Sequence, residues 1–115
     1  MREPLRDIAR IEHILECIDR LFDFTKDVTF EQYLENQMMK FAVIKNLEII
    51  GEAAYMLTPE FKEKHSEVDW APIVKMRHVL VHGYYQISNE VVWDVIQYDL
   101  HPLKEKIQAI LDKEE

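Results

Sequence analysis

The chain has 115 residues, 48% of them hydrophobic and 31% charged, and its formal net charge is −8 at pH 7. This length predicts a single domain over residues 1–115 and excludes separate catalytic and regulatory domains. The excess of 22 acidic over 14 basic residues argues against broad coating of nucleic acid, because such binding needs many Lys and Arg side chains on phosphates.

The first half of the chain predicts two long helices. Between about residues 4 and 24, apolar residues recur at steps of three and four, which is the pattern of an amphipathic helix. Thr29 and Gln32 have the spacing of a capping box, so a second helix should begin there and run to about Leu57. Gly51 lies inside this helix at a cost of about 1 kcal/mol relative to alanine, and we therefore expect a close helix contact at Gly51.

The second half predicts shorter helical segments. Thr58-Pro59 should end the second helix and begin a short one, because proline suits a first helical position. Asp69 is placed to cap the next helix, which should end at Gly83 in a left-handed conformation. Ser88 should begin a last helix that Pro102 kinks. The whole pattern predicts an all-α, up-down bundle of four to five helices.

The residues RHVLVHGYY, Arg77 to Tyr85, stand out in this acidic chain. They contain an arginine, two histidines and two tyrosines, and no carboxylate occurs between Asp69 and Glu90. A helix that is apolar on several sides is buried on several sides, yet isolated burial of a guanidinium would cost several kcal/mol. Arg77 must therefore meet a partner that supplies carboxylates or water, or face a cleft where an anion can sit.

Arg77, His82 and Tyr84 match the RX4HXY pattern of HEPN domains. Three longer segments resemble, in order and spacing, the HepT-like branch of this family: NLEIIGEAA (46–54), VDWAPIVKMRHVLVHGYYQIS (68–88) and VVWDVIQYDLHPL (91–103). The resemblance covers nearly the whole chain. It implies a HEPN-type helical bundle, a two-fold homodimer, and the toxin half of a bacterial toxin–antitoxin pair whose antitoxin is an MntA-like minimal nucleotidyltransferase.

The resemblance also implies a ribonuclease that needs neither a metal nor a cofactor. In such enzymes the ribose 2′-OH attacks the adjacent phosphate and leaves a 2′,3′-cyclic end; tRNA or mRNA is the expected class of substrate. His82 suits the role of base, since an imidazole titrates at roughly pH 6.5. Arg77 suits the developing charge, because its planar fork can hold two phosphate oxygens.

Four further residues are candidates for substrate binding. Lys75 and His78 could contact neighbouring phosphates, and Tyr84 or Tyr85 could stack on a base. In the HepT-like branch the tyrosine of the motif accepts AMP from the cognate nucleotidyltransferase. The resemblance therefore implies that Tyr84 is modified, which requires its phenol to be reachable from solvent.

The geometry of one helix separates the two catalytic candidates. On an ideal helix Arg77 and His82 differ by about 140°, too far round to hold one phosphate together. Either the helix loosens before Gly83, or each protomer brings its pair to a groove shared across a two-fold axis. We favour the second, assisted by the first, because a two-fold interface would also bury the apolar residues 79–81.

Other interpretations of the same residues remain open. Arg77 could instead form a structural pair with a carboxylate such as Glu48 or Glu52. His78 and His82 have the spacing of metal ligands, but no third ligand is evident nearby, so we predict no metal site. The alternative function is a non-catalytic HEPN module that presents substrate or nucleotide to a partner nucleotidyltransferase.

The sequence also indicates a compartment. Its lone cysteine, Cys17, cannot form an internal disulfide and is expected in the core. The N-terminal residues lack the apolar core of a signal peptide, and no apolar run approaches the roughly 18 residues of a membrane span. We therefore expect a cytoplasmic protein that does not contact a membrane.

Overall fold

The computed structural model describes residues 4–83 and 87–114, and all regular secondary structure within these ranges is helical. The all-α prediction is therefore confirmed. Four long helices form the body of the molecule: α1 (Pro4–Thr25), α3 (Gln37–Met56), α5 (Trp70–Gly83) and α7 (Leu100–Glu114). Three short helices lie between them in the chain: α2 (Phe30–Glu35), α4 (Pro59–Lys64) and α6 (Asn89–Asp94).

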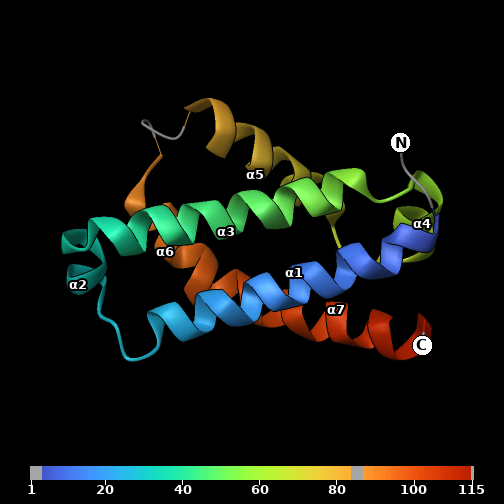
Figure 1. Cartoon of the computed structure of the whole chain (residues 1–115), viewed down its shortest axis with the longest axis horizontal. Helices are drawn as coiled ribbons and strands as arrows, with labels where there is room; N and C mark the ends of the chain where they lie inside the picture. Colours follow the sequence, from blue (N-terminus) through green and yellow to red (C-terminus); the bar gives the residue numbers. More distant parts are fainter. Residues whose placement is uncertain (1–3, 84–86, 115) are drawn as a thin grey trace.

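Helix α3 lies between α1 and α5, and α7 packs along α1 (Figure 1). The apolar stripe predicted on α1 enters the core, where Ile11, Ile18 and Leu21 are almost completely buried. Three other predicted members are only partly buried, Ile8, Leu15 and Phe22, while Ile14 is buried although the pattern did not include it. Burial of one such side chain contributes about 1.5–3 kcal/mol, so this stripe is the main attachment of α1. Cys17 is buried beside it, and that burial raises the pKa of the thiol, as expected of a core residue.

The predicted capping box is confirmed, but the long helix expected after it is interrupted. Thr29 Oγ1 accepts from Gln32 N at 3.1 Å, and Gln32 Oε1 accepts from Thr29 N at 2.9 Å. The prediction of one helix from there to Leu57 is wrong, because Asn36 is extended and ends α2. Its Oδ1 accepts from Met39 N at 3.0 Å and so caps α3, an example of an asparagine side chain competing with helical hydrogen bonds.

Side-chain caps and buried polar contacts fix α4 against the neighbouring helices. Thr58 caps α4 and Pro59 occupies its first turn, as predicted. The buried carboxylate of Asp7 in α1 accepts from Thr58 N at 3.0 Å and from Thr58 Oγ1 at 2.7 Å. Across the same end of the molecule, His65 Nε2 lies 2.7 Å from Glu114 Oε2 in α7. These contacts tie α4 to both α1 and α7.

The last helical segment begins where predicted and departs from α-helical geometry before its proline. Ser88 caps α6, accepting from Val91 N at 3.3 Å. A π-helical turn, η2 (Val95–Asp99), then separates α6 from α7. The ring of Pro102 would clash with the carbonyl four residues earlier, which lies in η2, so the irregularity expected from Pro102 appears in this wider turn.

Gly83 ends α5 without the predicted left-handed conformation. Its φ is not positive, since helical geometry continues through this residue. The prediction that α5 loosens before Gly83 is wrong for the same reason.

The close contact predicted at Gly51 is confirmed, and the partner is Arg77. A Cβ on Gly51 would lie 3.0 Å from both N and Cα of Arg77 and nearer still to its Cβ. The backbone of α5 thus lies so close to α3 at the motif arginine that only glycine fits at residue 51.

The two glycines should therefore respond in opposite ways to alanine. Gly51→Ala gains about 1 kcal/mol of helix propensity but overpacks the α3–α5 contact at a cost of about 1–3 kcal/mol, so it should lower the free energy of unfolding. Gly83→Ala meets nothing within 4 Å at a helical φ and should stabilise by up to about 1 kcal/mol. Urea unfolding measures both; equal shifts for the two variants would contradict the close contact.

Candidate active site

Arg77 is held against α3 by two side chains. Its Nε lies 2.5 Å from Glu52 Oε2, and its Cζ lies 5.2 Å from the centre of the Tyr55 ring. The contact with Glu52 is an ion pair without good hydrogen-bond alignment, since the buried Nε has no partner at a suitable angle. Of the two carboxylates considered as alternative partners of Arg77, Glu48 and Glu52, the structure pairs it with Glu52. The ion pair is still accessible to solvent, because the Arg77 side chain is 32% exposed and the Glu52 side chain is 50% exposed.

Arg77 lines a cleft of about 390 Å³ formed by α1, α3 and α5. Its charged and titratable side chains are Arg10 and His13 from α1, Lys45, Glu48 and Glu52 from α3, and Arg77 from α5. Three permanent cations therefore face two carboxylates in a chain whose net charge is −8. The sequence prediction missed Arg10, His13 and Lys45, because no spacing relates them to the motif and only tertiary packing brings them to it.

His82 lies on another side of α5. Its ring packs on that of His78, with centroids 4.7 Å apart and planes at 50°, and both side chains are exposed. His82 does not line the cleft that contains Arg77. Because α5 stays helical, the separation of about 140° between the two residues persists. One chain therefore does not bring the two catalytic candidates together.

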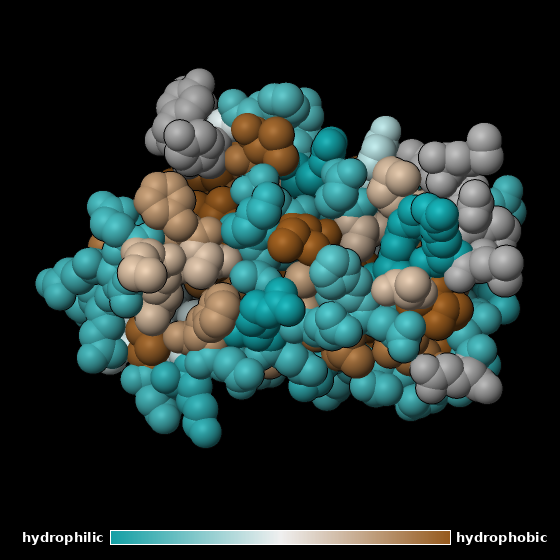
Figure 2. Space-filling view, in the orientation of Figure 1, coloured by the Kyte–Doolittle hydropathy of each residue, from teal (hydrophilic) through white to brown (hydrophobic). Residues whose placement is uncertain are grey.

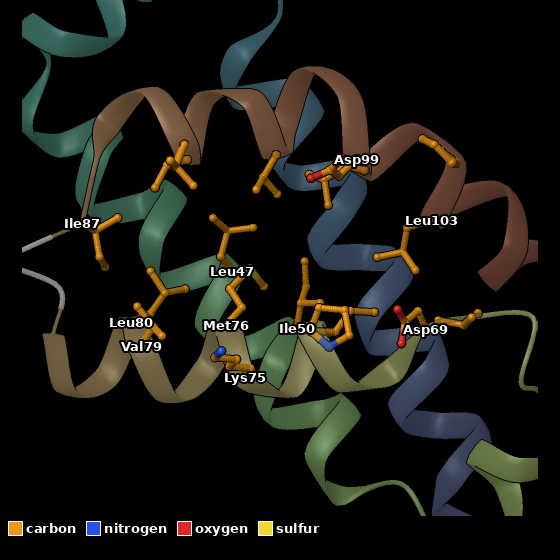
Figure 3. Close-up of a pocket in the computed structure, with 18 of the residues that line it drawn as sticks. Leu47, Ile50, Asp69, Lys75, Met76, Val79, Leu80, Ile87, Asp99 and Leu103 are labelled. Atoms are coloured by element: carbon orange, nitrogen blue, oxygen red, sulfur yellow. The ribbon is translucent and has the colours of Figure 1, made fainter.

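Lys75 precedes His82 by seven residues, or about two helical turns, and so lies on the same side of α5 as His82, away from Arg77. It lines a groove of about 600 Å³ between α5 and the segment formed by α6, η2 and α7 (Figure 3). Apolar side chains from both sides point into this groove, among them Met76 and Leu80 from α5 and Leu103 from α7. The structure thus separates Lys75 from Arg77. Two other candidates, Tyr84 and Tyr85, lie outside the described residues.

Two apolar side chains within the motif are exposed. Val79 and Val81 are 44% and 42% exposed, whereas Leu80 is buried in the core. Of residues 79–81 only the two valines are therefore exposed, and they lie on opposite sides of α5, Val79 at the apolar groove and Val81 at the cleft of Arg77. Further large apolar side chains are exposed at the end of α1 and the beginning of α3, a region that is apolar in Figure 2: Phe24, Met38 and Phe41.

A metal centre and a membrane span are two further possibilities for residues 4–83 and 87–114. Within these ranges, no group of three or more His, Cys, Asp or Glu side chains is arranged to hold a metal ion. None of the described helices combines the length and the apolar character needed to cross a membrane.

Comparison with known proteins identifies the family. The model of the family described as "Ribonuclease HepT-like" matches residues 14–110, which include α3, α5 and the motif. The chain belongs to the HepT-like ribonuclease family. The resemblance inferred from the sequence is therefore confirmed.

Relatives from several organisms match this HepT-like chain over most of their length. "Probable ribonuclease HepT" of Thermococcus cleftensis is 36% identical over 100 residues, 87% of this chain and 91% of the relative. "Putative RNase MJ1380" of Methanocaldococcus jannaschii is 34% identical over 106 residues, 91% and 97% of the two chains. "Putative RNase TTE0752" of Caldanaerobacter subterraneus subsp. tengcongensis is 36% identical over 104 residues, 90% and 93%. No solved structure matches the chain significantly.

Proposed function

We propose that this HepT-like chain is a metal-independent endoribonuclease and the toxin of a toxin–antitoxin pair, with Arg77 and His82 as its catalytic residues. The observation that carries the proposal is that Arg77, half-buried yet open to a cleft, shares one helix with an exposed imidazole. A fixed cation and a group that titrates in the neutral range are what RNA cleavage by the ribose 2′-OH requires.

In the proposed reaction, His82 takes the proton of the 2′-OH as its oxygen attacks the adjacent phosphorus. The new bond closes a 2′,3′-cyclic phosphate, the bond from phosphorus to the 5′-oxygen breaks, and that oxygen takes up a proton from water. Arg77 stabilises the negative charge that builds on the phosphate oxygens. To do so it exchanges the carboxylate of Glu52 for the phosphate, an exchange favoured by the exposure of this ion pair.

The active unit of this proposal is a homodimer. Arg77 and His82 of one chain lie on different sides of α5, so a shared phosphate needs Arg77 from one subunit and His82 from the other. Val81, beside Arg77 in the cleft, and Val79, on the side of α5 that carries His82, supply exposed apolar surface near the two residues. A two-fold interface would bury this surface twice and form two equivalent sites.

His82→Ala should lower kcat for RNA cleavage by about 10²–10⁴, the usual contribution of general acid–base catalysis. Arg77→Lys should also lower kcat, because an ammonium cannot replace the bidentate fork. The measurement is single-turnover cleavage of labelled RNA in the presence of a chelator. His101→Gln, which changes an exposed histidine on α7, is the control and should cleave like the parent chain. Equal rates for His82→Ala and the parent would contradict the assignment.

We also propose that an MntA-like nucleotidyltransferase inactivates this chain by transferring AMP to Tyr84. The phosphodiester of the attached AMP would be a fixed anion near Arg77, and it would compete with the phosphate of RNA. The support is the RX4HXY spacing, which puts Tyr84 two residues after His82, and membership of the HepT-like family.

Incubation with ATP and such an enzyme should therefore raise the mass of the peptide that contains Tyr84 by whole AMP units and abolish RNA cleavage. Tyr84→Phe should block both effects, and Tyr85→Phe should block neither. An unchanged mass, or a modified chain that still cleaves RNA at the parent rate, would contradict the proposal that AMP on Tyr84 inactivates this chain.

One observation favours a second function, a non-catalytic module that presents RNA or nucleotide to the nucleotidyltransferase. The ion pair between Arg77 and Glu52 gives the arginine a structural role that requires no chemistry. Such a module would bind RNA without cutting it, so cleavage by the parent chain that is lost in His82→Ala would exclude this function.

A further inference from the structure

The cleft at Arg77 continues well beyond the motif. It runs from Arg77 and Val81 on α5, across α3, to Arg10 and His13 on α1. On α1 these two residues are three positions apart, so they share one face of the helix. Polar side chains are prominent across the middle of the surface formed by α1 and α3 (Figure 2). The cleft is thus formed by three helices whose cations converge on one space.

The two cations that line this cleft besides Arg77, Arg10 of α1 and Lys45 of α3, are not neutralised by ion pairs. Glu52 is paired with Arg77, and none of the ion pairs formed between described residues involves Arg10, Lys45 or Glu48. Arg10 Nη1 is buried, and no described residue accepts a hydrogen bond from it. A buried charged donor without an acceptor is costly, and an anionic ligand would remove that cost.

The charged side chains of the cleft indicate that this ligand is an anion and favour one chemical class. Beyond the pair of Arg77 and Glu52, the cleft holds Arg10 and Lys45 against Glu48, with His13 as a further titratable donor. Its volume of about 390 Å³ lies within the range of small-molecule pockets of roughly 300–1,000 Å³. A phosphate group meets both requirements, because arginine and lysine side chains bind it through charge-assisted hydrogen bonds.

We propose that, beyond Arg77, this cleft is a second phosphate subsite, in which Arg10 of α1 and Lys45 of α3 bind an RNA phosphate next to the one that is cleaved. This inference rests on the proposed ribonuclease function. It implies that an RNA strand whose cleaved phosphate lies at Arg77 continues over α3 toward α1. The subsite binds and positions RNA and takes no part in bond breaking. It also explains how an acidic chain holds RNA: the cations are concentrated along one cleft.

The test measures the binding of a single-stranded, fully 2′-O-methylated RNA oligonucleotide, which cannot be cleaved by 2′-OH attack. The variant is Arg10→Gln with Lys45→Gln. The control, Lys26→Gln with Lys113→Gln, makes the same change in net charge at exposed positions outside the cleft. Fluorescence anisotropy at several salt concentrations gives the affinity and its salt dependence, and thermal unfolding checks the fold. Lys45→Gln alone is a milder variant at an exposed position.

The subsite variant should bind the oligonucleotide about tenfold more weakly. The slope of log affinity against log salt concentration, which is negative, should decrease in magnitude by about 1 to 1.5. Lys45→Gln alone should give roughly half of this change in slope, while the control should match the parent. With cleavable RNA, the subsite variant should raise KM and leave kcat within about twofold, as expected of uniform binding. A loss in kcat alone would overturn the subsite.

Other outcomes separate this inference from the proposed function. If no protein cleaves RNA but the subsite variant still loses oligonucleotide affinity, the ribonuclease proposal fails and the subsite stands. If the parent cleaves RNA through His82 while the subsite variant binds like the control, the subsite is overturned. Inorganic phosphate and AMP are tested as alternative ligands. If the subsite variant loses affinity for these two ligands but binds the oligonucleotide like the parent, the cleft is a site for free nucleotide, and the RNA assignment is overturned.

Discussion

The close approach of α5 to α3 at Gly51 determines how the candidate site is arranged. Because Gly51 has no side chain, the backbone of α5 rests on α3 at Arg77, and this contact sets the rotation of α5. Arg77 then faces the cleft with α1 and α3, whereas Lys75 and His82 lie on the other side of α5, where Lys75 lines the apolar groove and His82 packs on His78. The residues of one short motif are thus distributed over different surfaces.

This distribution accounts for the electrostatics of the site. Glu52 and the Tyr55 ring hold the guanidinium of Arg77 at the surface of α3, where it avoids the desolvation cost of full burial. The same ion pair is weak enough to be exchanged, since half of the Glu52 side chain is exposed. A structural counter-ion and an anion site are therefore compatible at one arginine.

Local signals in the sequence were sufficient to predict much of the fold, whereas contacts between distant residues were not. The caps at Thr29, Thr58 and Ser88 were predictable, because each depends on hydrogen bonds within four residues. Asn36 was missed, since its capping hydrogen bond competes with a helical pattern that continues on both sides. The motif identified Arg77, but Arg10 on α1 joins it only through packing.

Central to this account is a phosphate site assembled from Arg77 of one subunit and His82 of the other. Coexpression of Arg77→Ala and His82→Ala chains tests it directly, because a mixed dimer would hold one site with both residues intact. Random pairing makes half of the dimers mixed, so about a quarter of the parent's cleavage activity should return. A mixture that stays as inactive as either variant alone would contradict a site shared between two subunits.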